Sequence, residues 1–178
     1  IQVASGLYYG SVDVNKKISL VGENRETTII DGKGARVVVE LGTNVSITNF
    51  TIRDGEYGVR IWSYSYMGEY RGNTINNNKI TGNLYGAIYV KGANNTITDN
   101  LILNNSLFGI HLCNACNNTM INNVVVDNLH GIDLEGGSND NILRSNRMIN
   151  NTYNFGLNLR SGETRNFLLG TPSRPGIV

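Results

Sequence analysis

The sequence predicts an all-β, single-domain parallel β-helix, a solenoid of about seven or eight coils. Three observations predict this fold. A frame of three asparagines, each five residues from the next, occurs four times, and successive frames lie 22 or 23 residues apart. Apolar residues occupy fixed offsets between these asparagines. Each repeat also holds three short apolar runs, which have the length of strands rather than of helices.

Asparagine suits the corners of such a coil for two reasons. It tolerates the left-handed backbone conformation better than any residue except glycine. Its amide also reaches the asparagine of the next coil, about 4.8 Å away, so the amides form a ladder along the stack. A disordered asparagine-rich tract would not keep apolar residues at constant offsets. The predicted ladder positions are Asn73, Asn78, Asn83, Asn95, Asn100, Asn105, Asn118, Asn123, Asn128, Asn141, Asn146 and Asn151.

The order of elements follows from the same pattern. Residues 1–14 alternate apolar and polar and are expected to form two strands, with further strands near 18–21, 28–32, 37–41 and 45–52. Alignment with the later repeats places Val45, Phe50 and Gly55 at the ladder positions of an early coil. We expect the β-helix over residues 1–160, an aromatic insertion at 62–72 that stretches one period to 28 residues, and an irregular tail or cap at 161–178.

Composition sets further limits. The chain has 178 residues, of which 40% are hydrophobic and 16% charged, with a net charge of +1, so it is foldable and gives no sign of nucleic-acid binding. No apolar run reaches 18 residues, so no membrane span is expected. No signal peptide is recognisable, and the chain begins inside an expected strand, which suggests a processed or excised chain.

The early segments carry a family resemblance. The phrases VNKKISLVGENRETTIIDGKG and NVSITNFTIRDGEYGVRI, followed by the Asn-Gly coils, resemble the NosD-like periplasmic copper-binding family over roughly residues 7–160. That family belongs to the wider right-handed parallel β-helix group of the pectin-lyase type. The resemblance implies a right-handed β-helix and raises copper handling as one function.

After each Gly, one strand alternates inward apolar residues with outward residues that stack in columns. The predicted inward pairs are Val59/Ile61, Ile88/Val90, Ile110/Leu112, Ile132/Leu134 and Leu157/Leu159. One outward column is predicted to read Glu40, Arg60, Tyr89, His111, Asp133, Asn158. Its neighbour is predicted to read Trp62, Lys91, Cys113, Glu135, Arg160.

The outward columns predict a saccharide-binding face. Sugars bind exposed aromatic rings flanked by charged and amide groups, because a ring offers flat apolar area with polar edges. The predicted ligand-binding residues are Arg60, Trp62, Tyr64, Tyr66, Tyr70, Tyr89, Lys91, His111, Asp133 and Glu135. The alternative is a solvated sheet face stabilised by stacked opposite charges.

Asp133 and Glu135 are also weak catalytic candidates. Their carboxylates are expected about 6–7 Å apart, a spacing compatible with glycoside hydrolysis. An ordinary acidic pair on a surface strand is the competing explanation, and we expect the chain not to be an enzyme.

His111, Cys113 and Cys116 form an H-x-C-x-x-C motif, with His130 in the next coil. Thiolates and imidazole suit copper(I) or zinc, so these three are weak metal candidates. We expect a Cys113–Cys116 disulfide, typical of proteins outside the cytosol, ahead of two free thiols or a metal. No cofactor is expected, with copper as the alternative.

Six sequons fit an exported glycoprotein, at Asn44, Asn49, Asn94, Asn104, Asn117 and Asn150. The sequence thus predicts an extracellular, cell-surface or periplasmic scaffold that binds polysaccharide or a cell-surface glycan, or serves as a structural surface module. The alternatives are a subunit that stacks end to end into a filament, a copper-handling accessory protein, and a polysaccharide hydrolase or lyase.

Overall fold

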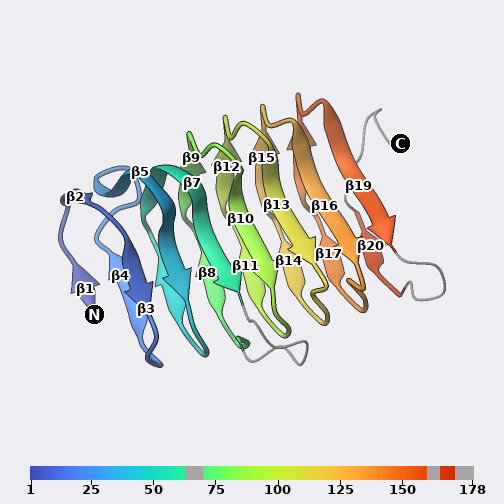
Figure 1. Ribbon diagram of the computed structural model, residues 1–178, viewed down its shortest axis with the longest axis horizontal. Helices are drawn as coiled ribbons and strands as arrows, with labels where there is room; N and C mark the ends of the chain where they lie inside the picture. Colours follow the sequence, from blue (N-terminus) through green and yellow to red (C-terminus); the bar gives the residue numbers. More distant parts are fainter. Residues whose placement is uncertain (63–69, 160–164, 171–178) are drawn as a thin grey trace.

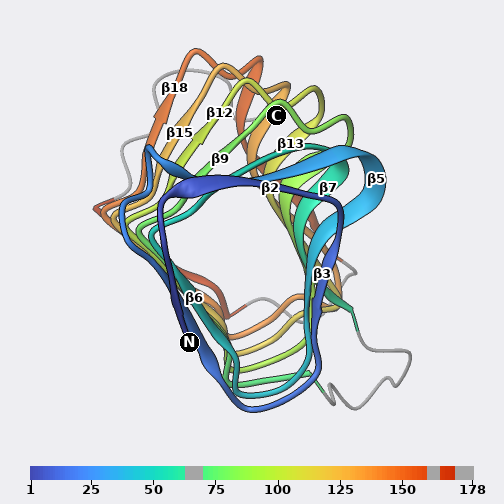
Figure 2. The same cartoon turned by 90° about the vertical axis from the view of Figure 1, so that its left-hand side faces the viewer.

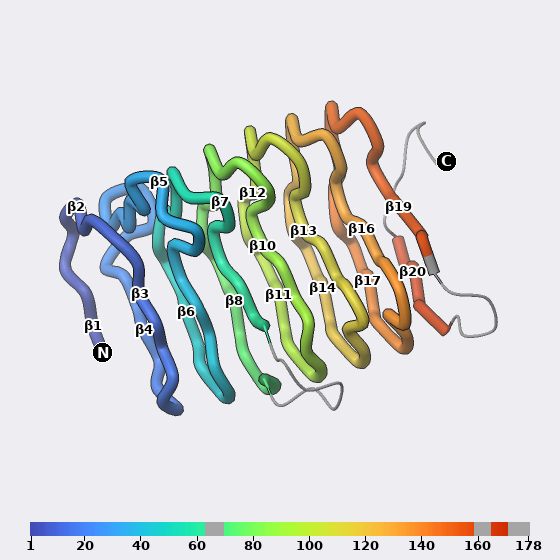
Figure 3. Tube along the Cα trace, viewed as in Figure 1, coloured from blue at the N-terminus to red at the C-terminus, as the bar shows by residue number. Residues whose placement is uncertain are grey.

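The computed structural model describes residues 1–62, 70–159 and 165–170, and its chain winds into a parallel β-helix. Successive coils lie side by side from the N-terminal to the C-terminal end (Figures 1 and 3), and the view along the rod shows a three-sided outline (Figure 2). No helix in the described residues is long and apolar enough to cross a bilayer.

The first side of the rod is a sheet of eight parallel strands, one from each coil in the described residues. Eight such strands delimit seven turns, which confirms the predicted coil number. In spatial order they are β1 (Gln2–Val3), β4 (Ser19–Gly22), β6 (Ser46–Thr48), β8 (Thr74–Asn76), β11 (Thr96–Thr98), β14 (Thr119–Ile121), β17 (Ile142–Arg144) and β20 (Phe167–Leu169).

The other two sides form one continuous sheet because two long strands, β5 (Thr28–Leu41) and β7 (Thr51–Trp62), run around the corner between them. The second side also holds β2 (Gly6–Tyr9), β9 (Lys79–Thr81), β12 (Leu101–Leu103), β15 (Val124–Val126) and β18 (Arg147–Ile149). The third side holds β3 (Val12–Val14), β10 (Gly86–Lys91), β13 (Phe108–Cys113), β16 (His130–Gly136) and β19 (Tyr153–Leu159).

The core consists of the apolar residues that the offsets singled out. On the first side Ile47, Ile75, Ile97, Met120 and Leu143 pair in register from coil to coil, and each is fully buried. Burying one such side chain contributes about 1.5–3 kcal/mol. Because every coil repeats the contribution, the stack rather than any single strand stabilises the rod.

The asparagine ladder is present, and its hydrogen bonds satisfy the side-chain amide groups that are buried at the corners. Asn123 shows the pattern: its Nδ2 donates to Asn146 Oδ1 at 2.9 Å and to the Ile97 carbonyl at 2.8 Å, and its backbone N–H donates to Asn146 Oδ1 at 3.1 Å. Its own Oδ1 accepts two hydrogen bonds from Asn100. The predicted early corners lie on the same columns, since the backbone N–H groups of Val45 and Phe50 donate to Asn73 and Asn78.

We had expected the left-handed backbone conformation at the ladder asparagines. It is found instead at the residue that precedes each of them. Asn122, which precedes Asn123, has φ of 56°, and Asp99, which precedes Asn100, has φ of 57°. The preceding residue turns the chain, and the ladder residue then directs its amide inward along the stack. All six sequon asparagines occupy such positive-φ turns: Asn44, Asn49, Asn94, Asn104, Asn117 and Asn150. The corner geometry therefore accounts for the sequons, and glycosylation stays a prediction.

The C-terminal boundary differs from the prediction. Within the stretch expected to be irregular, β20 pairs in parallel with β17, and the Asn166 side chain accepts hydrogen bonds from the backbone and side chain of Asn141. The ladder thus continues one position beyond the twelve predicted. The single asparagine of this coil was not recognised because no five-residue frame surrounds it.

Candidate functional site

The outward surface of β7, β10, β13, β16 and β19 carries most of the predicted site residues, and we call it the aromatic face. Parallel register places Arg60, Tyr89, His111 and Asp133 in one column. Glu40 pairs with Arg60 at the start of the same column, so the predicted column is confirmed from Glu40 to Asp133. The aromatic face is defined by Tyr57, Trp62, Tyr89, Phe108, His111, His130 and Tyr153.

Ring contacts run along the aromatic face from coil to coil. Trp62 stacks on Tyr89 with centroids 5.5 Å apart, and the Tyr89 ring meets His111 edge-on at 5.3 Å. The chain of contacts continues from His111 to Phe108 at 4.2 Å and from Phe108 to His130 at 5.0 Å. His130 then stacks on Tyr153 at 5.0 Å. The rings therefore form a row along the rod.

Tyr89 is not an exposed platform, contrary to the prediction. Its side chain is buried beneath the Trp62 ring, and burial and the neighbouring Cys113 raise its pKa. Tyr70 is partly buried and packs against the core. Tyr64 and Tyr66 lie outside the described residues.

The N-terminal half of the aromatic face holds cations around Trp62. The Arg60 guanidinium lies 5.5 Å and the Lys91 ammonium 5.0 Å from the Trp62 ring centroid, as in cation–π contacts. Arg60 Nε also donates to Glu40 Oε2 at 2.7 Å. A hollow of about 400 Å³ opens here, lined in part by Arg36, Glu40, Arg60, Trp62 and Tyr70.

Glu40 makes the stability of this half depend on pH. Burial raises the pKa of Glu40 above its ordinary value and outweighs the lowering by Arg60. A carboxyl group with a raised folded pKa contributes its full stability below the unfolded pKa of about 4.3, and the contribution is lost as pH rises through the folded pKa. In the wild-type protein the free energy of unfolding should therefore decrease as pH rises from about 4.3 to the raised pKa of Glu40. We expect Glu40→Gln to make this decrease smaller, and urea unfolding at a series of pH values measures it.

Glu23→Gln is the matched control for this prediction. A hydrogen bond from the Ser5 backbone lowers the pKa of Glu23, so its contribution is lost as pH falls rather than as it rises. An unchanged slope above pH 4.3 in Glu40→Gln would contradict the prediction.

The C-terminal half of the aromatic face brings an imidazole and two carboxylates together. His111 Nε2 lies 3.0 Å from Glu135 Oε2 and 3.7 Å from Asp133 Oδ2. One ligand atom of each residue lies within 4.8 Å of the others. The carboxylates are therefore closer than the predicted spacing, because both turn toward His111. Burial raises the pKa of Asp133, and the two histidines only partly offset it.

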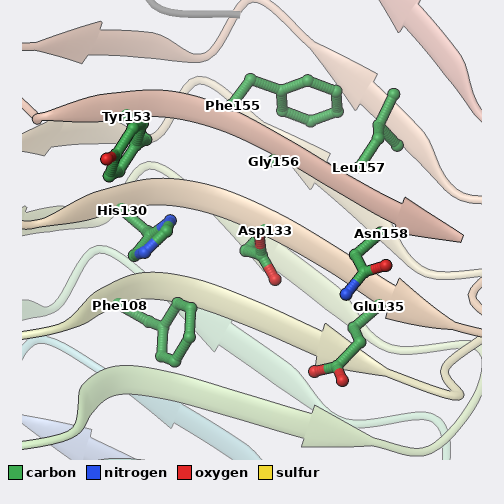
Figure 4. Close-up of a pocket in the computed structure, with 9 residues that line it drawn as sticks. All are labelled: Phe108, His130, Asp133, Glu135, Tyr153, Phe155, Gly156, Leu157 and Asn158. Atoms are coloured by element: carbon green, nitrogen blue, oxygen red, sulfur yellow. The ribbon is translucent and has the colours of Figure 1, made fainter. Parts of the chain in front are cut away.

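A pocket of about 440 Å³ opens beside this cluster. Figure 4 shows Phe108, His130 and Tyr153 one above another on successive strands, with Asp133 between this row and Glu135. The lining is completed by Phe155, Gly156, Leu157 and Asn158. One wall is therefore aromatic and the other carries carboxylate and amide groups.

Gly156 makes room for the Asp133 carboxylate. Gly156 is the register partner of Asp133 on β19, and a Cβ atom at Gly156 would overlap Asp133 Oδ1. Any side chain at this position would push the carboxylate aside. The sequence had placed Asn158 beside Asp133, but the register pairs Asn158 with Glu135.

The outward and inward residues of the last coil were predicted wrongly because one residue pair resembles another. Phe155-Gly156 resembles Phe108-Gly109, but His130 pairs with Tyr153, and Phe155 is a buried core residue opposite Ile132. Phe155 and Leu157 are therefore the register partners of Ile132 and Leu134, but Leu157, predicted to point inward, is 47% exposed. Leu159 pairs with Gly136 instead. Counting from the ladder would have found Tyr153, because it follows Asn151 by two residues just as His130 follows Asn128.

The predicted disulfide between Cys113 and Cys116 does not form, and both residues are free thiols. Cys113 Sγ accepts from Asn114 Nδ2 at 3.4 Å, whereas Cys116 Sγ donates to the Gly137 carbonyl of the next coil at 3.2 Å. The intervening corner turns the two sulfur atoms toward different partners. The converging ligand group found in the described residues joins His111 to carboxylates rather than to these thiols.

Comparison with known proteins places this geometry in a family. A family model described as a right-handed β-helix region matches residues 22–170. No curated protein sequence matches the chain.

Solved structures show the same fold at low sequence identity. ORF18 of Geobacillus virus E2 is 15% identical with a TM-score of 0.68, over 83% of this chain and 34% of that one. The Dettilon tailspike protein gp208 is 15% identical with a TM-score of 0.63, over 91% and 40% of the two chains. A pectin methylesterase from carrot is 14% identical with a TM-score of 0.55, over 99% and 75%.

The chain spans about a third of the length of the viral ORF18 protein and 40% of the tailspike. At these identities the likeness concerns the fold alone. Because the family model covers most of its length, the chain belongs to the right-handed β-helix family.

Proposed function

We propose that the aromatic face binds a polysaccharide, with the pocket beside Asp133 as its principal subsite. The observation that carries the proposal is the composition of this pocket: Phe108, His130 and Tyr153 on one side, and Asp133, Glu135 and Asn158 on the other. A sugar ring has apolar faces and a rim of hydroxyl groups, so an aromatic wall facing carboxylate and amide groups complements it.

Size and placement support the proposal. The pocket volume of about 440 Å³ falls within the range of about 300–1,000 Å³ of small-ligand sites. The hollow at Trp62 lies on the same face toward the N-terminal end, so a chain of sugars running along the rod would meet both. The carrot pectin methylesterase, whose name states action on pectin, shares the fold.

Location follows from the proposed ligand. A protein that binds polysaccharide or a cell-surface glycan acts where these polymers are, so we place it outside the cell, on the cell surface or in the periplasm. Stacking of chains end to end stays a prediction.

Saccharide binding is tested with an array of neutral and acidic polysaccharides, followed by calorimetry on the best ligand in the presence of a chelator. Tyr153→Ala removes a ring that is 39% exposed and lines the pocket. We expect binding weaker by about two- to tenfold, since an aromatic contact contributes about 0.5–1.5 kcal/mol. Trp62→Ala tests the N-terminal hollow in the same way.

Tyr9→Ala is the matched control, because Tyr9 is an exposed tyrosine of β2, on the second side of the rod. It should bind like the wild-type protein. No saturable binding to any polysaccharide, or equal losses in Tyr153→Ala and Tyr9→Ala, would reject the proposal.

A further inference from the structure

We propose that His111, Asp133 and Glu135 bind a divalent transition-metal ion such as Zn²⁺. This goes beyond saccharide binding and does not depend on it. The site uses imidazole and carboxylate ligands from β13 and β16, two neighbouring coils of the rod, and it excludes the thiols of the H-x-C-x-x-C motif.

The distances fit a metal with short ligand bonds. Zinc binds imidazole nitrogen and carboxylate oxygen at about 2.0–2.2 Å, so two ligands of a tetrahedral ion lie about 3.3–3.5 Å apart. The separations from His111 Nε2 to the two carboxylates, 3.0 Å and 3.7 Å, bracket this value. The third separation, between the two carboxylates, lies within 4.8 Å, so the three ligand atoms can converge on one ion.

Asp133 supplies the second, independent observation. Its side chain is 13% exposed, and in the described part of the chain the nitrogen that lies against its carboxylate is His111 Nε2 at 3.7 Å, beyond hydrogen-bonding distance. The carboxylate is mostly shielded from water but reaches the pocket, so its oxygens are available to an ion that enters there. The carboxylate occupies space beside Gly156 that any side chain at position 156 would fill. The glycine therefore accommodates the acidic group.

The charge of the cluster points to a cation as well. Two carboxylates face one imidazole. A divalent ion would balance both carboxylates. Asp133 and Glu135 also line the pocket, so the fourth coordination position opens toward it and stays available to water or a ligand oxygen.

The ligand types select the metal class. One nitrogen and two oxygen donors suit Zn²⁺, Co²⁺ or Mn²⁺, while copper(I) prefers thiolate or thioether sulfur. The inference therefore differs from copper(I) handling by Cys113 and Cys116, and a cysteine variant separates the two.

The test is titration of the chelator-treated protein with Zn²⁺ by calorimetry, and with Co²⁺ by visible absorption, without saccharide. We expect one ion per chain. Glu135→Gln and Asp133→Asn keep the side-chain shape and should each weaken binding at least about tenfold. Circular dichroism verifies that both variants fold, and Zn²⁺ should raise the melting temperature of the wild-type protein but not of the variants.

Two matched controls use the other candidate ligands. His130→Gln removes the other imidazole of the chain, and Cys113→Ser removes the nearest thiol; both should bind Zn²⁺ like the wild-type protein. Absence of saturable binding, or binding that Glu135→Gln and Asp133→Asn leave unchanged, would overturn the proposal. So would binding that is lost in Cys113→Ser.

Discussion

Replacing Asn123 with alanine should destabilise the protein by about 3–5 kcal/mol. The side chain is fully buried, and its loss removes four hydrogen bonds: two that it accepts from the Asn100 backbone N–H and amide, and two that it donates to the Ile97 carbonyl and Asn146 Oδ1. Each buried polar group left unpaired costs about 1–3 kcal/mol. The free energy of unfolding, measured in urea by far-ultraviolet circular dichroism, gives the value.

Asn122→Gly is the matched control. Asn122 is exposed and has φ of 56°, a conformation that glycine adopts without strain. We expect a change within about 0.5 kcal/mol. If Asn123→Ala were no more damaging than Asn122→Gly, the amide ladder would not be the main support of the corners.

Replacing Gly109 with alanine should cost about 3 kcal/mol. The added Cβ would overlap Val125 Cγ1 and lie 2.5 Å from the Gly131 carbonyl oxygen of the next coil. The oxygen belongs to the backbone of a paired strand, so it cannot move aside without disturbing the sheet. The same urea unfolding experiment applies, and the midpoint should shift to lower urea.

The preceding coil supplies the comparison for Gly109. Ala87 holds the equivalent position between Gly86 and Ile88, which pair with Phe108 and Ile110. Ala87→Gly removes a buried methyl group and should cost only about 1 kcal/mol. A Gly109→Ala variant as stable as the wild-type protein would show that these two coils are less closely packed than the structure has them.

The sequence predicted the ladder and the core because both repeat at a constant interval. A buried corner amide must pair with the same residue one coil further on, so asparagine recurs at every coil. The inward positions recur for the same reason, and Ile75, Ile97 and Met120 were correctly placed from their offsets alone.

The site was less predictable from the sequence because its side chains do not recur at a constant interval from coil to coil. Tyr153 was missed because Phe155-Gly156 has the same residue types as an outward pair, while its position relative to Asn151 makes Phe155 a core residue. The Cys113–Cys116 disulfide failed because spacing says nothing of the direction in which a corner turns its side chains. The convergence of Asp133 and Glu135 on His111 depends on side-chain rotamers, which a pattern of residue types does not fix.

The register between β16 and β19 places Gly156 beside Asp133, and cross-linking tests it most directly. In a protein with Cys113→Ser and Cys116→Ser, the pair Glu135→Cys and Asn158→Cys occupies partner positions, so mild oxidation should form a disulfide and consume both thiols. The pair Asp133→Cys and Asn158→Cys lies diagonally, about 8 Å apart between Cα atoms, and should stay reduced. Cross-linking of the diagonal pair in place of the direct pair would contradict the structure of the site.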